Sequence, residues 1–219
     1  MKIFYINLKN RTDRKEHMEK MLSNLNLDYD RFEAICPTIN EIKFGIYKKF
    51  YDKACSRFKK YVNNEVTHPR AIGVFGCYLS HLIIHESQLE NNNPYMILED
   101  DVKFTTDSLV QLEKITSNYE DWDIVRGGFG RRRSGPKQFN GVHVESMFSN
   151  SFKTHKIYGG SHFCVFKNAK KIVDFMDSEN VLAIDALYSN CVLNVYYQRM
   201  GIRVGEFGTD IPKIELKPN

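Results

Sequence analysis

The sequence lacks any long hydrophobic run. No apolar stretch approaches the roughly 20 residues that a membrane-spanning helix needs. The first apolar run, residues 2–6, is cut short by Asn7 and by the charged residues that follow it, so we expect no signal peptide. Both absences favour a protein that folds in water and does not cross a membrane.

Charge of one sign is not in large excess either. Lys and Arg number 31 and Asp and Glu number 27, which gives a formal net charge of +4. This mild positive balance suits an anionic substrate or an anionic membrane surface. It does not by itself demand a nucleic acid.

The cysteines do not have the spacing of a disulfide framework. The five cysteines, at positions 36, 55, 77, 164 and 191, are odd in number, and no pair has zinc-finger spacing. This usage indicates the reduced thiols of a cytoplasmic protein. With 219 residues, of which 42% are hydrophobic and 13% aromatic, the chain can bury a substantial core. We therefore expect one domain that spans residues 1–219.

The most informative segment is residues 95–102, in which four mostly apolar residues run into Glu99, Asp100 and Asp101. This pattern predicts a buried strand whose carboxyl end opens into a cleft. Three adjacent carboxylates repel one another unless a cation or hydrogen-bond donors offset the charge. Mg²⁺ and Mn²⁺ prefer oxygen ligands, so the segment predicts a divalent metal site. The alternative is a solvated acidic turn.

The N-terminal segment has the pattern of a nucleotide-binding unit. Residues 2–8 predict a strand, and the helix that follows could be capped by Thr12 or Asp13. In such a unit the polar turn lies at the carboxyl end of the strand, where ligands bind. Arg11 and Arg14 are therefore positioned to meet a phosphate or a base. Ordinary solvated surface arginines would give the same pattern.

Residues 71–90 predict a long helix with Gly73 and Gly76 near its start. Glycine at such positions lets another backbone, a sugar or a nucleotide approach closely. Ser80 and His81 lie on the same helix. A helical histidine beside apolar residues is commonly a packing residue, so the pattern alone leaves its role open.

Two basic segments support a different hypothesis. Residues 41–70 interleave lysines with aromatic residues, which is typical of a partly helical excursion and also of nucleic-acid or anionic-lipid binding. The Gly/Arg segment 126–136 predicts an exposed loop, without the pattern of a phosphate-binding loop. The alternative function is therefore a basic, aromatic-rich binding protein that uses residues 43–61 and 126–133.

A single carboxylate, Asp185, lies within the apolar run 183–187. It could cap a helix. It could equally be a functional group whose pKa is tuned by its surroundings.

Several stretches resemble glycosyltransferase family 25, whose members make lipooligosaccharide. The two most specific are Gly73-Val74-Phe75-Gly76-Cys77-Tyr78-Leu79-Ser80-His81, which is similar to the G-x-x-G-C-x-x-S-H signature, and the acidic motif Ile97-Leu98-Glu99-Asp100-Asp101-Val102. The opening Ile6-Asn7-Leu8, the segment from Gly159 to Asp185, and Thr209-Asp210-Ile211 agree less specifically.

The resemblance implies an α/β, GT-A-like fold: a central, mostly parallel sheet flanked by helices, with a helical excursion at about 41–70. It also implies transfer of a sugar, most plausibly galactose from UDP-galactose with inversion, onto a lipooligosaccharide or lipopolysaccharide acceptor. A cytoplasmic location with peripheral contact to the inner membrane is expected, and nucleic acid is not expected as a partner. A transferase that binds the donor without turnover is a third possibility.

The resemblance also assigns roles to individual residues. Asp101 is the expected ligand of Mn²⁺ or Mg²⁺, and Glu99 or Asp100 is expected to bind ribose or a metal-bound water. Asp185 is the candidate base that takes the proton of the acceptor hydroxyl. The residues expected to bind the UDP-sugar are Asn7, Arg11, Arg14, Ser80, His81, Glu99 and Asp100.

Overall fold

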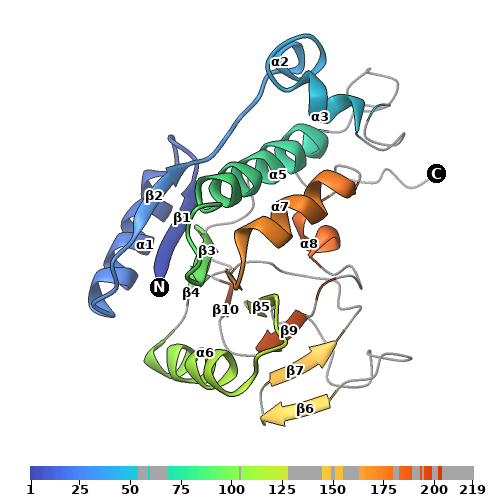
Figure 1. Ribbon diagram of the computed structural model, residues 1–219. Helices are drawn as coiled ribbons and strands as arrows, with labels where there is room; N and C mark the ends of the chain where they lie inside the picture. Colours follow the sequence, from blue (N-terminus) through green and yellow to red (C-terminus); the bar gives the residue numbers. More distant parts are fainter. Residues whose placement is uncertain are drawn as a thin grey trace, which may run out of the picture.

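The structure, a computed structural model, is an α/β layer arrangement in which helices cover both faces of a central sheet (Figure 1). The residues that it describes are 1–53, 59, 69–103, 105–127, 145–148, 151–154, 163–179, 183–188, 193, 195–198 and 202–203. The predicted fold class is confirmed.

The central sheet has eight strands. In spatial order they are β2 (Asp30–Glu33), β1 (Lys2–Asn7), β3 (Tyr95–Glu99), β8 (Phe163–Phe166), β5 (Ile124–Gly127), β9 (Val195–Gln198), β7 (Ser151–Thr154) and β6 (Glu145–Phe148). All of them except β8 and β7 point the same way, so the sheet is mostly parallel in direction, as predicted.

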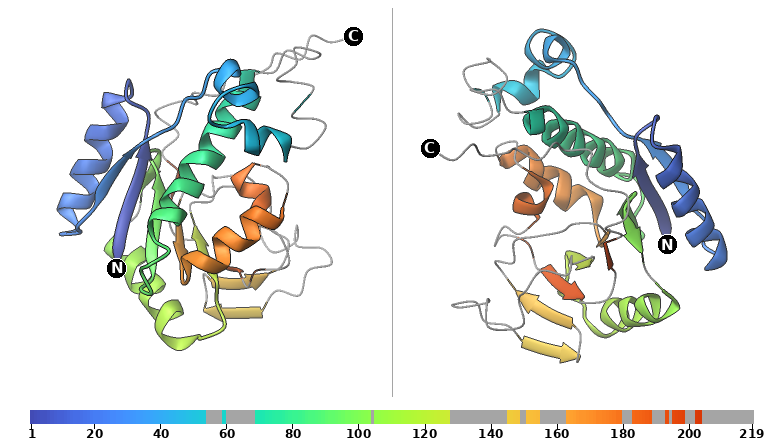
Figure 2. Two further views of the ribbon diagram at one scale, coloured as in Figure 1. Left: turned by 45° about the horizontal axis from the view of Figure 1, so that its top comes forward. Right: turned by 180° about the vertical axis from the view of Figure 1, so that it is seen from behind.

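The helices form two layers (Figure 2). α5 (Pro69–Ser87), α7 (Ala169–Ser178) and α8 (Ile184–Leu187) share one hydrophobic core with the sheet. α1 (Thr12–Asn24) and α6 (Thr106–Asn118) share a second core on the opposite face. We call these the α5 side and the α1 side of the sheet.

Alternation along the strands explains why there are two cores. Successive side chains of a strand point to opposite faces. Accordingly, Phe4 and Ile97 pack on the α5 side, whereas Tyr5 and Leu98 pack on the α1 side. The nearly continuous apolar character of residues 3–6 and 95–98 thus follows from burial on both faces.

The start of α1 differs from the expectation. Neither Thr12 nor Asp13 caps the helix, because the N-cap residue is Arg11, which makes no side-chain capping bond. The Asp13 carboxylate accepts instead from Nε and Nη2 of Arg11, at 2.9 and 2.8 Å. The Asn7 side chain donates to the carbonyl oxygen of Arg11 at 3.1 Å, so β1 fixes the first turn of α1.

The helical excursion is present in part. α2 (Ile39–Lys43) and α3 (Lys48–Asp52) are short helices near the N-terminal end of α5 (Figure 1). The later residues of the excursion, 54–58 and 60–68, lie outside the described part of the chain. Within that part, no helix combines the length and the apolar character that crossing a bilayer requires.

Gly76 makes the close backbone contact that glycine permits. A Cβ atom at Gly76 would lie 2.2 Å from the carbonyl oxygen of Ile35, whereas one at Gly73 would meet no described residue within 4 Å. Within the described part of the chain, packing therefore requires glycine at position 76 but not at position 73. Gly76 lets α5 approach the segment that leaves β2.

Candidate functional site

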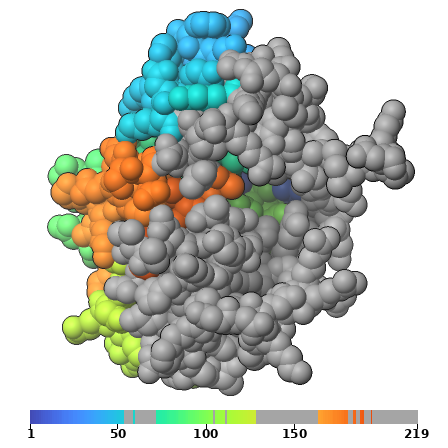
Figure 3. All heavy atoms as spheres, turned by 90° about the vertical axis from the view of Figure 1, so that its right-hand side faces the viewer, coloured from blue at the N-terminus to red at the C-terminus, as the bar shows by residue number. Residues whose placement is uncertain are grey.

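The acidic motif lies where two parallel strands end side by side. Ile6 of β1 is the register partner of Glu99 of β3, so Asn7 and Asp100 come next at the same edge. Ligands bind at the carboxyl ends of the strands in open α/β sheets. Figure 3 shows blue atoms of the N-terminal segment next to green atoms of the middle of the chain.

Asp100 is held by two groups from the N-terminal unit. Its Oδ1 accepts from Nη1 of Arg14 at 2.6 Å, and its Oδ2 accepts from Nδ2 of Asn7 at 2.8 Å. All three side chains are buried. These bonds join positions 86 and 93 residues apart in the sequence, so they fix the acidic motif against the start of the fold.

The charge state of Asp100 reflects opposing effects. Burial raises the pKa of the Asp100 carboxyl, and the nearby charge of Asp101 raises it further. The bonds from Arg14 and Asn7 lower the pKa, but the net direction is upward. Neighbouring carboxylates that disfavour each other's ionised forms are the situation that a divalent cation relieves. The carboxylates of this turn therefore fit a hard metal ion.

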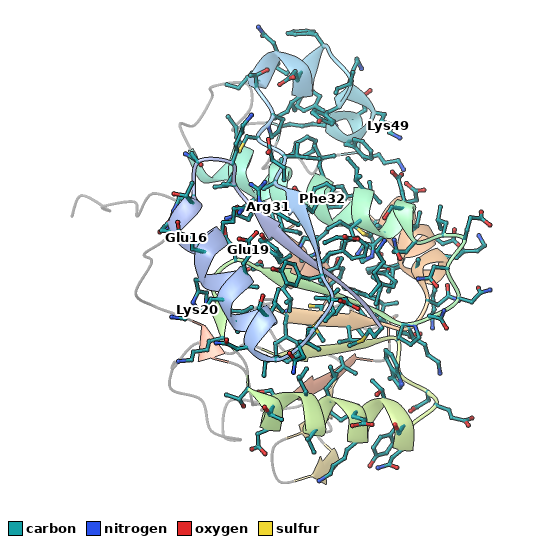
Figure 4. All side chains as sticks on the ribbon, turned by 90° about the vertical axis from the view of Figure 1, so that its left-hand side faces the viewer. Glu16, Glu19, Lys20, Arg31, Phe32 and Lys49 are labelled. Carbon is teal, nitrogen blue, oxygen red and sulfur yellow. The ribbon has the colours of Figure 1, made fainter. Side chains whose placement is uncertain are left out.

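Asn7 has its whole side-chain amide engaged. Besides its two donor bonds, its Oδ1 accepts from Nε of Arg31 at 3.1 Å. Arg31 lies on β2 beside α1, which carries the labelled Glu16 and Glu19 (Figure 4). Asn7 thus connects β1, β2, the start of α1 and the acidic turn. Sequence reasoning named Asn7 but missed Arg31, because the adjacency of β2 and β1 has no local signal.

The guanidinium of Arg11 pairs with the carboxylate of Asp13 at 2.8 Å. The hydrogen bond from Arg11 lowers the pKa of Asp13 to about 2. Arg11 and Arg14, which were both predicted to meet a phosphate or a base, therefore form ion pairs with different carboxylates. Arg14 pairs with Asp100 of the acidic motif, and Arg11 pairs with Asp13 in the first turn of α1.

Ser80 links α5 to the exit of β2. Its Oγ donates to the carbonyl oxygen of Gly76 at 2.8 Å and accepts from the amide of Ile35 at 2.9 Å. The side chain is fully buried. The contact of Gly76 with Ile35 lies one helical turn away, so the signature helix and the β2 exit form one packed unit.

His81 belongs to a buried chain of histidines and tyrosines. Its Nδ1 lies 3.1 Å from the hydroxyl of Tyr188, and that hydroxyl lies 2.6 Å from Nε2 of His85. Nδ1 of His85 lies 2.6 Å from the hydroxyl of Tyr95. Burial lowers the pKa of His85 well below the ordinary value, with a smaller contribution from the charge of His81. This chain joins α5, β3 and the end of α8.

Two residues of this chain, His85 and Tyr188, and the neighbouring Cys77 were not predicted from the sequence as site residues. His85 follows His81 by four positions on one helical face, and this spacing was the available signal. Cys77 precedes His81 by the same interval. Tyr188 lies three residues after Asp185, and nothing local pointed to its hydroxyl.

Other predicted residues are only partly described. The backbone of Asp185 lies in α8, but its side chain is outside the described residues. Of the Gly/Arg segment, residues 128–136 are likewise outside. Arg126 and Gly127 belong to β5 rather than to an exposed loop, and Arg126 is fully buried. The prediction of a loop from Arg126 onward was wrong for Arg126 and Gly127. Arginine is usually exposed, so its charge gave no indication of a buried position in a strand.

A comparison with protein families identifies the family of this chain. The family model for glycosyltransferase family 25, described as LPS biosynthesis proteins, matches residues 1–176. The chain belongs to this family.

The chain is similar to several longer proteins. A glycosyltransferase 25 family member of Anopheles gambiae is 30% identical over 135 residues, which is 60% of this chain and 22% of that protein. Procollagen galactosyltransferase 1-A of Xenopus laevis is 29% identical over 137 residues, 60% of this chain and 21% of that protein. The chain therefore spans about a fifth of the length of these relatives.

Solved structures with related shape are more distant. A glycosyltransferase involved in glycosylation of the major capsid of PBCV-1 has a TM-score of 0.36 and 11% identity, over 81% of this chain and 63% of that one. An inositol-1-phosphate CTP transferase from T. maritima has a TM-score of 0.41 and 12% identity, over 92% and 69%.

Proposed function

We propose that this chain is a single glycosyltransferase domain, residues 1–219, that transfers a hexose from a nucleotide sugar. The donor we favour is UDP-galactose and the acceptor a lipooligosaccharide or lipopolysaccharide saccharide, with inversion at the anomeric carbon. Membership of family 25 and the galactosyltransferase names of its relatives support the reaction class.

One observation carries the proposal: the buried contact of Asp100 with Arg14 and Asn7 at the carboxyl ends of β3 and β1. It brings a carboxylate, a guanidinium and an amide to the edge of the sheet where a nucleotide would bind. A solvated acidic turn would not need such anchoring.

In this proposal the carboxylates hold a hard divalent cation, Mn²⁺ or Mg²⁺. Asp101 is the direct ligand, and Glu99 or Asp100 contacts ribose or a metal-bound water. When bound, the cation supplies Lewis-acid stabilisation of the diphosphate leaving group. Asp101 is only 4% exposed. Burial raises the pKa of Asp100 and the charge of Asp101 adds a smaller contribution, which a bound cation would offset.

The remaining residues bind, orient and accept a proton. Arg11 and Arg14 hold the nucleotide through its negative charge, with Ser80 and His81 beside the donor. Asp185 takes the proton of the acceptor hydroxyl, on the face of the sugar opposite the leaving group. Tyr188 supports this role by hydrogen-bonding the end of α8 to His81 and His85 of α5.

A thermal-shift panel of nucleotide sugars, with and without Mn²⁺, tests the donor and the metal together. We expect UDP-galactose with Mn²⁺ to raise the melting temperature, and Asp101→Ala to abolish both this shift and sugar transfer while the variant remains folded. Binding without turnover would identify a donor-binding protein. A folded Asp101→Ala variant with undiminished transfer would overturn the metal assignment.

We further propose peripheral contact with the cytoplasmic face of an anionic membrane through α2 and α3. Phe44 and Ile46, 76% and 74% exposed, lie between these helices, and the ammonium of Lys43 lies 5.7 Å from the Phe44 ring centre. Exposed apolar side chains beside lysines suit an anionic interface. The burial of Arg126 argues against the nucleic-acid alternative.

Vesicle flotation tests this contact. We expect binding to vesicles that contain phosphatidylglycerol and loss of binding on replacing both Phe44 and Ile46 by Ser. Leu89→Ser is the matched control, because Leu89 is also exposed but lies beyond the other end of α5. Equal flotation of the two variants would refute the proposed surface.

A further inference from the structure

A second cluster of candidate ligands lies on the α5 side of the acidic motif. Cys77, His81 and Glu99 each offer a ligand atom, and these three atoms lie within 4.8 Å of one another. Cys77 and His81 are one helical turn apart on α5, and Glu99 is the last residue of β3. Residues four apart on a helix present their side chains to the same side. The cluster is therefore built by two packed elements.

The chemistry of these ligands differs from that of Asp100 and Asp101. Thiolate and imidazole select Zn²⁺ and similar borderline-soft ions, whereas Mg²⁺ and Mn²⁺ prefer oxygen. Bonds of about 2.0–2.3 Å to a tetrahedral zinc ion put ligand atoms about 3.5 Å apart. The spacing of 4.8 Å or less can reach this value by side-chain rotation.

The surroundings of His81 are those of a metal-binding histidine. A ligating imidazole generally donates its other ring N–H to an acceptor, which fixes the ring and its tautomer. Here Nδ1 of His81 lies 3.1 Å from the Tyr188 hydroxyl, and the chain continues to His85 at 2.6 Å. If Nδ1–H of His81 donates to the Tyr188 hydroxyl, that hydroxyl can donate in turn to Nε2 of His85, so both bonds of Tyr188 are made.

We propose that Cys77, His81 and Glu99 form a Zn²⁺ site, with Nε2 of His81, the thiolate of Cys77 and one carboxylate oxygen of Glu99 as ligands. Of the two carboxylates proposed above to contact ribose or a metal-bound water, Asp100 then has that role. Cys77 loses its proton to water as the Zn–S bond forms. Three protein ligands leave a fourth position for water. Cys77 and Glu99 are partly exposed, so an ion can reach the site from solvent. His81 is buried and forms the inner side of the site.

Cobalt spectroscopy on the chelator-treated chain tests the site directly. We expect added Co²⁺ to give a near-ultraviolet thiolate-to-cobalt charge-transfer band with the visible bands of a tetrahedral ion, and Zn²⁺ to bleach both. Cys77→Ser should lose the charge-transfer band. Cys36→Ser, at an exposed thiol, should keep it. The absence of the band in the unaltered chain, or its persistence in Cys77→Ser, overturns the proposal.

A second measurement needs no substitution in the cluster. Zn²⁺ should slow alkylation of Cys77, mapped by peptide mass, and leave Cys36 unchanged. Equal alkylation of Cys77 with and without Zn²⁺ contradicts the site even if Cys77→Ser fails to fold.

Tyr188→Phe keeps the ring but removes the hydroxyl, and we expect about 10- to 100-fold weaker Co²⁺ binding. Unchanged affinity would remove Tyr188 from the proposal. Both readouts are independent of sugar transfer and of the donor.

Discussion

Both sides of the sheet bury polar groups, but those on the α1 side are charged and those on the α5 side are neutral. On the α1 side, Arg14 and Asp100 form a charged pair at 2.6 Å. On the α5 side, His81, His85 and Tyr188 form a chain in which burial lowers the pKa of His85 and so keeps it neutral. The α1 side should therefore be sensitive to losing a charge, and the α5 side to gaining one.

The largest effect is expected from breaking the charged pair. Arg14→Met leaves the carboxylate of Asp100 buried without its cationic partner. Removing one member of a buried pair costs about 3–5 kcal/mol, and we expect the free energy of unfolding in urea to fall by this amount. The double variant Arg14→Met, Asp100→Asn should recover part of the loss, because no unpaired charge remains. A loss below about 1 kcal/mol would place Arg14 among surface residues.

Packing on the α5 side gives the next largest effect. Gly76→Ala puts a Cβ atom 2.2 Å from the carbonyl oxygen of Ile35, so α5 must shift. We expect a loss of about 1–3 kcal/mol in the free energy of unfolding. Gly73→Ala is the matched control on the same helix. With no described residue within 4 Å of the new atom, it should gain up to about 1 kcal/mol through helix propensity.

Acid should act on the α5 side through His85. An unfolded histidine takes up a proton as the pH falls below about 6.5, whereas burial keeps His85 neutral. The unfolded state then binds more protons than the folded state. The free energy of unfolding therefore decreases as the pH is lowered, by up to about 1.4 kcal/mol per pH unit from this group. Urea unfolding from pH 7 to 5 should show a smaller decline in His85→Gln.

The control for this pH dependence is His17→Gln, because His17 is a partly buried residue of α1 that bonds the carbonyl oxygen of Val102 at 3.0 Å. We expect it to keep the decline of the unaltered chain. If His85→Gln and His17→Gln show the same pH profile, the charge contrast between the two sides is refuted.

The smallest effect on stability is expected at Arg11. Its pairing with Asp13 is exposed, so Arg11→Ala should leave the melting temperature within experimental error. If Arg11 also holds the nucleotide, donor affinity measured by calorimetry should fall. An unchanged affinity would leave Arg14 as the arginine that serves the α1 side.

Much of this arrangement was legible in local patterns. The apolar run before Glu99 predicted the buried strand β3, and the strand, turn and helix at the N-terminus predicted a nucleotide-binding unit. The α/β fold as a whole was implied by the resemblance to family 25. The helix with Gly76, Ser80 and His81 was also predicted, over residues 71–90, and the structure has it at Pro69–Ser87. These features depend on residues close together in the sequence.

The unpredicted features depend on distant partners. The bond of Tyr188 to His85 spans 103 positions, and that of Arg31 to Asn7 depends on which strands become neighbours. Arg126 was misplaced because a charged residue in a buried strand contradicts its usual exposure. Local propensity carries no information about such tertiary contacts.

The short strand after the acidic turn has a consequence for biosynthesis. Among the described residues, β4 (Val102–Lys103) pairs with β10 (Ile202–Arg203) in the second sheet, so this partner leaves the ribosome about 100 residues later. At synthesis rates of about 5–20 residues per second, a nascent chain must wait several seconds for this partner. Until then the turn that carries Asp100 and Asp101 lacks this pairing on its β4 side, so the turn is completed only after residue 203 has been made.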